Sequence, residues 1–278
     1  PATTGLSLPK ENIGKVVNQG FEFEVTYTNK YKDFNYSVSA NIGFQKNKIK
    51  FWDETPGVPE YQKSTGHPMN SALYYKAIGV FKDQADIDAY PHWDGARPGD
   101  IIFKDVNDDK IINALDKVRI YKTDLPTLTG GMNIDFEYKN FYSSIFLQGA
   151  SGAVRSNYFN LQGESGNYFA EDAKGRWTED NPSSIKPRVW NTAGEYWRAQ
   201  SNTYWLKNND YLRLKNIVIG YNLPDTIKNR LGVAGMQIYV SGTNLITLDK
   251  IKNFDPETTS SLSYPLNKVF NIGFTLDF

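Results

Sequence analysis

The chain lacks cysteine entirely and has only two histidines, His67 and His92, among its 278 residues. The absence of cysteine excludes disulfide frameworks and cysteine-based zinc sites, and two histidines leave few groups for a metal site or a proton relay. Neither sign of charge is in excess, because 31 basic and 31 acidic residues give a formal net charge of zero. A strongly basic nucleic-acid-binding protein is therefore excluded, and we expect no nucleic-acid partner.

Long hydrophobic runs are also missing. No stretch reaches the roughly 18 consecutive apolar residues that a membrane-spanning helix requires. Apolar residues nevertheless make up 40% of the chain and aromatic residues 14%, which is enough apolar surface for an ordered protein. This composition is compatible with a transmembrane β-barrel, because barrel strands alternate between apolar and polar residues and keep the mean hydropathy low.

Alternation with a period of two recurs along the chain and predicts β-strands, because successive side chains of a strand point to opposite faces. In residues 21–27 every odd position is apolar or aromatic, and every even position is Glu or Thr. In the segment 211–221 the phase of the alternation shifts near Asn216, which predicts a β-bulge. Residues 34–44, 130–139 and 236–241 alternate in the same way, 141–149 is strand-like but less regular, and 73–81 is expected to be a further strand.

The last nine residues form the clearest predicted strand. Its apolar row consists of Phe270, Ile272, Phe274, Leu276 and Phe278. A strand that ends on an aromatic carboxy-terminal residue suits an outer-membrane barrel, in which the last strand closes the barrel during assembly. An ordinary C-terminal strand of a soluble sheet would show the same alternation, so this segment alone does not decide between the two.

The spacing of the predicted strands favours the barrel. Short connections, such as the one around 29–33, alternate with long polar stretches, and outer-membrane barrels join their strands in this way. Soluble sandwiches rarely carry several loops longer than about 15 residues. A short amphipathic helical turn is expected over 224–235, at the end of the barrel where the short turns lie (the periplasmic side). The long loops are 45–72, 82–117, 150–203 and 245–267.

Four stretches, kept in a fixed order along the chain, carry a family resemblance. They are 12–22 with the strand 36–41 that follows, 98–107, 211–224, and 240–265 with the terminal strand. The first stretch contains NIGK and NQGFE, and the second contains PGDI and KDVN. The third contains YLRLKN and GYNLP, and the fourth contains VSGTNL, DPE and YP. In these residues the chain resembles the C-terminal barrel portion of the SusC/RagA class of TonB-dependent outer-membrane transporters.

The resemblance implies an all-β fold, an antiparallel transmembrane β-barrel of about 22 strands with long extracellular loops. This chain, 1–278, would supply about nine or ten of them, and the plug and the N-terminal strands would lie outside it. We expect a partial chain, because half a barrel would leave two unpaired strand edges in hydrocarbon. The family further implies a transporter and not an enzyme. It would import a glycan or peptide nutrient, with a SusD-like surface lipoprotein as partner and TonB acting through the missing N-terminal part.

Residues 105–116 resemble a calcium-binding loop, D-x-[DN]-x-[DN]-G-x5-E, in which clustered oxygen atoms hold the cation. Lys110 stands where the motif has glycine, and the last ligand is an aspartate instead of the longer glutamate. An acidic surface turn with Ile112 as an apolar anchor is the alternative interpretation. The candidate Ca²⁺ ligands are Asp105, Asn107, Asp109, Ile111 (through its carbonyl), Asn113 and Asp116.

The six tryptophans all lie in or beside the predicted loops. Aromatic faces in loops can stack on sugar rings or peptide side chains, because they offer large rigid contact area. Anchoring at the membrane interface and packing within the loops are the alternatives. Our candidates for contact with ligand or partner are Trp93, Trp177, Trp190 and Trp197.

Two other functions fit parts of this pattern. A soluble secreted carbohydrate-binding module with a calcium turn would also show alternating strands and aromatic loops, but its apolar rows would meet in a core. A glycan hydrolase could use Glu22 and Glu24, whose carboxylates would be about 7 Å apart on one strand face. In the barrel the polar rows line a water-filled lumen, and Glu22, Glu24, Asn41, Asp135 and Glu137 should face it.

Overall fold

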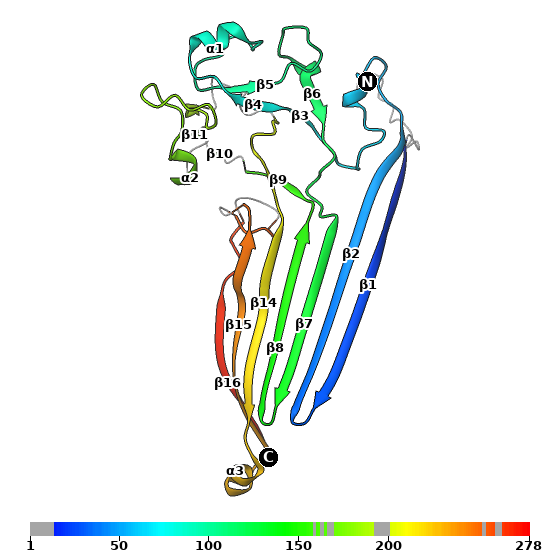
Figure 1. Ribbon diagram of the computed structural model, residues 1–278, viewed down its shortest axis with the longest axis vertical. Helices are drawn as coiled ribbons and strands as arrows, with labels where there is room; N and C mark the ends of the chain where they lie inside the picture. The colour runs from blue at the N-terminus through cyan, green and yellow to red at the C-terminus, as the bar shows by residue number, and fades with distance from the viewer. Residues whose placement is uncertain are drawn as a thin grey trace, which may run out of the picture.

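The computed structural model describes residues 14–157, 160–161, 164–165, 170–191, 201–251, 254–258 and 263–278. Its main feature is a sheet of seven long strands, with the order β1-β2-β7-β8-β14-β15-β16 and antiparallel pairing throughout (Figure 1). The strands are β1 (Gly14–Tyr31), β2 (Phe34–Trp52), β7 (Leu128–Tyr138), β8 (Phe141–Ser151), β14 (Tyr211–Asn222), β15 (Gly235–Asp249) and β16 (Val269–Asp277). We call this sheet the wall.

The short connections lie at one end of the wall and the long ones at the other (Figure 1). At the turn end lies α3 (Asp225–Leu231), where a helical turn was predicted. At the loop end the chain forms the pairs β3 (Leu73–Tyr75) with β6 (Lys117–Arg119), β4 (Ala77–Val80) with β5 (Ile101–Phe103), and β9 (Val154–Ser156) with β13 (Leu206–Asn208). The other loop-end elements are β10 (Asn160–Leu161), β11 (Glu164–Ser165), β12 (Trp190–Asn191), α1 (Gln84–Ala89), α2 (Ala170–Ala173) and two 3-10 turns, Glu60–Gln62 and Ala114–Asp116.

The predicted antiparallel, all-β class is confirmed, but the strand count differs. The wall has seven strands within the described residues, and not about nine or ten. The segment 73–81 was expected to be a further strand of this kind. It is divided into β3 and β4, which pair with other loop segments and not with the wall. The bulge predicted near Asn216 is present, because the register of β14 shifts between Leu214 and Asn216 against both neighbours.

One face of the wall is apolar across all seven strands. Phe21, Phe23, Val25 and Tyr27 of β1 pair with the apolar row of β2, and the register carries the row on to β16. These side chains are uncovered: Phe23 is 59% exposed, and Ile272 on the far edge is 80% exposed. No second sheet covers this face within the described ranges, so the apolar rows do not form the core that a soluble sandwich requires.

The tightly packed core lies elsewhere, among the loops. The largest fully buried apolar side chains belong to β4, α1, β5 and the residue after β4. They are Val80, Phe81, Ile87, Ile101 and Phe103. The loop end is therefore an ordered body with its own core. No helix in the part of the chain that the structure describes has the length and apolar character needed to cross a membrane.

Aromatic side chains gather at the turn end of the apolar face, as in the girdles of membrane barrels. The rings of Phe34 and Tyr36 lie 5.6 Å apart, and those of Phe141 and Tyr221 lie 4.6 Å apart. From Phe34 to Phe44 the apolar row of β2 runs for about 33 Å of strand. At a barrel tilt of about 40° this is a band about 25 Å high, which matches the apolar band of outer-membrane barrels.

The opposite face of the wall is polar. The five residues predicted to face water share this face. Glu22 and Glu24 alternate on β1, and Glu24 pairs with Asn41 of β2. Asn41 pairs with Gly131 of β7, and Asp135 and Glu137 lie four and six residues after Gly131 on the same face. Hydroxyl groups bond across it, for example Thr26 to Ser39 at 3.0 Å. The wall is thus apolar on one side and polar on the other, which is the arrangement of a water-filled membrane barrel.

Candidate ligand- and partner-contacting loops

Trp93 takes part in the core of the loop end. Its ring centroid lies 5.1 Å from that of Phe103, which stacks on Tyr75 at 4.8 Å. The side chain is half-buried and packs against the cluster that contains Ile101 and Ile112. Trp93 therefore has a packing role, and only its remaining exposed edge is available to a ligand.

Trp177 joins two of the long loops. Its indole Nε1 donates a hydrogen bond to the carbonyl oxygen of Lys82 at 2.9 Å. The ring lies against Gly99, whose φ is +87° and where an added Cβ would be 2.6 Å from the ring. This position therefore requires glycine both for its backbone conformation and for space.

A buried ion pair strengthens the same junction. Asp100 is completely buried, and its Oδ1 accepts a hydrogen bond from Arg188 Nε at 2.8 Å. The backbone N–H of Arg188 also donates to the carbonyl of Gly99 at 2.8 Å. The loops 82–117 and 150–203 are thus held together as one surface, although sequence reasoning listed them separately.

Trp190 lies in β12, where its backbone pairs with Ser165, and Trp197 falls outside the described residues. Contact between the four tryptophans and a ligand or partner stays a prediction.

The calcium-like loop adopts part of the expected backbone shape. Asp108 and Lys110 have positive φ angles of 59° and 68°. Lys110 thus has the left-handed conformation that favours the glycine of the calcium motif. Its ammonium group forms an ion pair with Asp108, so the cation of the side chain lies beside the loop.

The carboxylates of this loop are engaged by backbone N–H groups. Asp105 accepts a hydrogen bond from Lys110 N at 2.9 Å, and Asp109 accepts one from Ile111 N at 2.8 Å. The buried Asp116 accepts two, from Val106 N and Asn113 N, both at 2.8 Å. Among the described residues, no group of three or more His, Asp or Glu side chains could hold a metal ion. Calcium binding by this loop therefore stays a prediction, and the ion would have to compete with these backbone bonds.

Sequence reasoning missed a charged cluster on the polar face of the wall. Arg213 of β14 is only 1% exposed, and its guanidinium contacts both Asp255 and Glu257. Nη2 lies 2.8 Å from Asp255 Oδ1, and Nε donates to Thr247 of β15 at 3.0 Å. Residues 254–258 of the connection between β15 and β16 are therefore bound back against the polar face of the wall.

Neighbouring charges complete this cluster. Lys215 Nζ lies 2.9 Å from Glu257 Oε2, and Arg155 Nη1 donates to the carbonyl of Asp255 at 3.1 Å. Burial raises the pKa of Asp255, but the backbone N–H of Glu257 and the guanidinium of Arg213 outweigh it, so the net shift is downward. The available signal was the pair of cations at alternate positions, 213 and 215, of a strand that contains no other charged residue.

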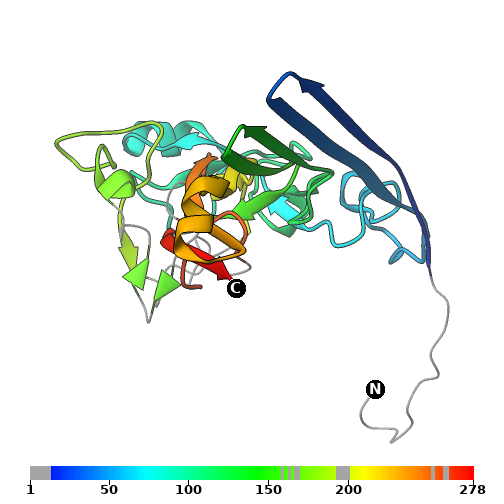
Figure 2. The same ribbon diagram turned by 90° about the horizontal axis from the view of Figure 1, so that it is seen from below.

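The terminal strand β16 lies at the edge of the wall. Phe270, Ile272 and Phe274 point to the apolar face and are exposed, while Leu276 is half-buried opposite Met236. Phe278 follows the strand and is 94% exposed. Within the described residues β16 pairs only with β15, and β1 pairs only with β2, so the wall has two open edges, which lie apart in the view from below (Figure 2). The role of this strand in barrel assembly stays a prediction.

Comparison with known proteins agrees with this architecture. No family model matches the chain. Two TonB-dependent receptors of Formosa agariphila are 31% and 29% identical to it, over 92% and 100% of the chain. The TonB-dependent receptor SusC of Bacteroides thetaiotaomicron is 25% identical over 96% of the chain. The chain spans only 27%, 30% and 27% of the lengths of these three relatives.

Solved structures have the same fold. The RagAB peptide transporter matches all of the chain with a TM-score of 0.71 at 24% identity, and the chain covers 31% of it. The RagAB peptide importer in its open-open state gives a TM-score of 0.72 at 23% identity, with 30% of that chain covered. Over nearly its whole length the chain thus matches a part of TonB-dependent receptors of the SusC type, and its antiparallel wall has the fold of the corresponding part of the RagAB structures.

Proposed function

We propose that this chain forms part of a barrel that imports a nutrient across the outer membrane. The observation that carries the proposal is the two-sided wall, which has an uncovered apolar face and a polar face opposite it. A wall of this kind separates hydrocarbon from water, and an import channel needs that separation. The loop end would then lie outside the cell and the turn end in the periplasm.

The partners follow from the same family. A SusD-like lipoprotein would close over the loop end, and TonB would act through an N-terminal part of the protein. The junction of Gly99, Trp177, Arg188 and Asp100 gives the lipoprotein a preformed surface, because it fixes two long loops against each other. Preformed surfaces bind with less loss of conformational entropy than loops that become ordered on contact.

The cargo is a glycan or a peptide. SusC-like and RagAB-like relatives are both similar to this chain, and RagAB is described as a peptide transporter. The polar face offers hydroxyl, amide and carboxylate groups, which suit either cargo. We do not assign catalysis to Glu22 or Glu24, because they lie on this extended face and not in a closed pocket with other ionisable groups.

Uptake in cells tests the proposal. A strain that lacks the full-length gene is complemented with the wild type or with Gly99→Val, and uptake of labelled oligosaccharides and of labelled peptides is measured with and without TonB. We expect TonB-dependent uptake of one cargo class and a loss of uptake and of lipoprotein co-purification in Gly99→Val. A matched control is Gly95→Val, at another left-handed glycine with nothing within 4 Å of the added Cβ. Uptake that persists without TonB, or none of either class at normal surface levels, would overturn the proposal.

A further inference from the structure

Lysines extend the apolar face of the hairpin β1–β2 toward the loop end. On β2, every second residue from Phe34 to Phe44 belongs to the apolar row, and the same row continues with Lys46 and Lys48. The apolar row of β2 therefore passes into positive charge toward the loop end.

Two further lysines border this row. Lys50 follows next to the irregularity of the β1–β2 pairing, and Lys15 ends the outward row of β1. All four side chains are exposed, and within the described residues none has a hydrogen bond or ion pair. We call Lys15, Lys46, Lys48 and Lys50 the lysine patch. Four unpaired cations at one strand end repel one another unless an anion lies between them.

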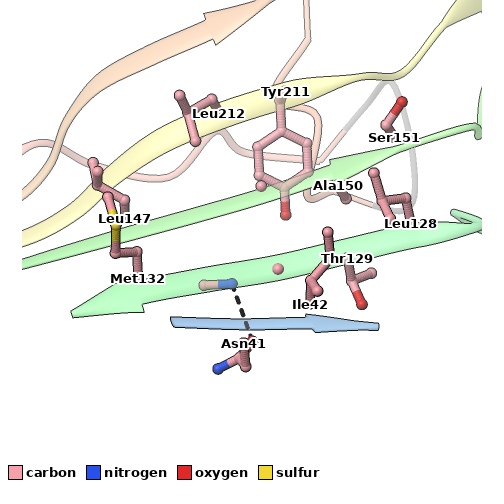
Figure 3. Close-up of a pocket in the computed structure, with 13 residues that line it drawn as sticks. Asn41, Ile42, Leu128, Thr129, Met132, Leu147, Ala150, Ser151, Tyr211 and Leu212 are labelled. Carbon is pink, nitrogen blue, oxygen red and sulfur yellow. Dashed lines mark hydrogen bonds between the residues drawn. The ribbon is translucent and has the colours of Figure 1, made fainter. Parts of the chain in front are cut away.

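An apolar hollow of about 390 Å³ adjoins the same row lower on the wall (Figure 3). It exists because Gly130 of β7 lies directly opposite Gly149 of β8, so two neighbouring positions of the apolar face have no side chain. Its sides are formed by apolar residues of four strands. They include Ile42, Leu128, Met132, Leu147 and Leu212.

The hollow and the lysine patch are close enough for one molecule. Ile42 pairs with Gly130 in the hollow, and Lys46 is four residues further along β2, which is about 13 Å. Between them, Phe44 pairs with Leu128 of the hollow.

We propose that the outer wall binds a phosphorylated membrane lipid at this place. The lysine patch holds the phosphate groups of the headgroup, and the hollow between Gly130 and Gly149 takes an acyl chain. Lysine is a strong point charge for phosphate, and an apolar hollow that opens to hydrocarbon is filled by a chain of the same chemistry. With the loops outside, as proposed above, this lipid belongs to the outer leaflet.

Binding of lipid A bisphosphate to the full-length transporter tests the headgroup part. The protein is delipidated and placed in phosphatidylcholine nanodiscs, and fluorescent lipid A is titrated with and without inorganic phosphate. We expect the double variant Lys46→Gln, Lys48→Gln to bind about tenfold more weakly. The control Lys32→Gln, Lys139→Gln removes two lysines at the turn end and should stay within about twofold of the wild type. Excess inorganic phosphate should weaken binding to the wild type more than to the Lys46→Gln, Lys48→Gln variant, because it competes for the same lysines. The proposal is wrong if the two double variants bind lipid A alike.

A second variant tests the acyl-chain part. Ile42→Trp places a large ring beside the hollow without removing buried packing, because Ile42 is exposed. We expect weaker lipid A binding in this variant, and unchanged binding would contradict the assignment of the hollow. Heat-modifiable migration in gels confirms that each variant is folded. Cargo uptake by the Lys46→Gln, Lys48→Gln variant should stay normal, so a failure of lipid binding is distinguishable from a failure of import.

Discussion

Arg213 and Asp255 form an ion pair of 2.8 Å in which the guanidinium is almost completely buried on the polar face of the wall. The pair joins β14 to a connection 42 residues further along the chain. A charge buried in this way is stable only while its partners stay in place, because an unpaired buried charge is costly. The cluster therefore holds residues 254–258 of the β15–β16 connection against the wall.

Replacing Arg213 should release this connection. Arg213→Ala leaves Asp255 and Glu257 without their main cation, and loss of one partner of a buried pair costs about 3–5 kcal/mol. We expect rapid cleavage within 250–268 by a protease added to the folded barrel. Lys228→Ala is the control, because Lys228 pairs with the exposed Asp225 on α3 at 2.7 Å. Equal protease resistance of Arg213→Ala and the wild type would contradict this role.

Acid should loosen the same connection. The pKa of Asp255 is lowered in the folded state. Its ionised carboxylate therefore stabilises the connection fully above the ordinary aspartate pKa of about 3.9, and this stabilisation is lost as the pH falls through the lower folded pKa. The resistance of 250–268 to protease should thus be unchanged above about pH 5 and should fall in stronger acid. Asp255→Asn should remove this pH dependence. A connection that is released between about pH 6 and 8 would point to another group.

One substitution in the calcium-like loop should raise its affinity for calcium. Lys110→Gly removes the cation and keeps the positive φ of 68° that glycine favours. We expect weak calcium binding in the wild type and at least about tenfold tighter binding in Lys110→Gly, measured by calorimetry. Lys104→Gly, outside the loop, is the control. If neither protein responds to calcium or to a chelator, residues 105–116 are a structural turn.

The terminal aromatic residue should matter for assembly. Phe278 is exposed at the end of an open-edged strand, and its ring would reach lipid or a neighbouring strand in a complete barrel. We expect Phe278→Ala to lower the amount of folded protein in the outer membrane several-fold. Thr275→Ala, in the polar row of the same strand, should leave it unchanged. Normal surface levels of Phe278→Ala would refute the predicted role.

The wall could be predicted well from the sequence, because alternation is a local signal. Strand lengths were less accurate. β2 continues to Trp52, since its backbone pairing persists after the apolar row changes to lysine beyond Phe44. The segment 73–81 alternates poorly and pairs with segments far along the chain, so its place among the loops depends on tertiary packing around Phe103.

The candidate site was harder to predict, because its contacts join distant segments. Trp177 and Lys82 are 95 residues apart, and Arg188 and Asp100 are 88 apart. Nothing local in the sequence relates such residues. The tryptophans were identified as candidates by type and loop position alone, and the structure gives Trp93 and Trp177 packing partners that a single sequence does not reveal.

The central claim is that the apolar rows face lipid and the polar rows face water. This part of the protein has no cysteine, so single labels can be placed by Phe23→Cys and Glu24→Cys on adjacent residues of β1. A fluorophore at each position is tested in proteoliposomes with a lipid-dissolved quencher and a water-soluble quencher. The account predicts that the label at position 23 responds to the lipid quencher and the label at 24 to the aqueous one. Aqueous quenching at both positions, or the reverse order, would contradict it.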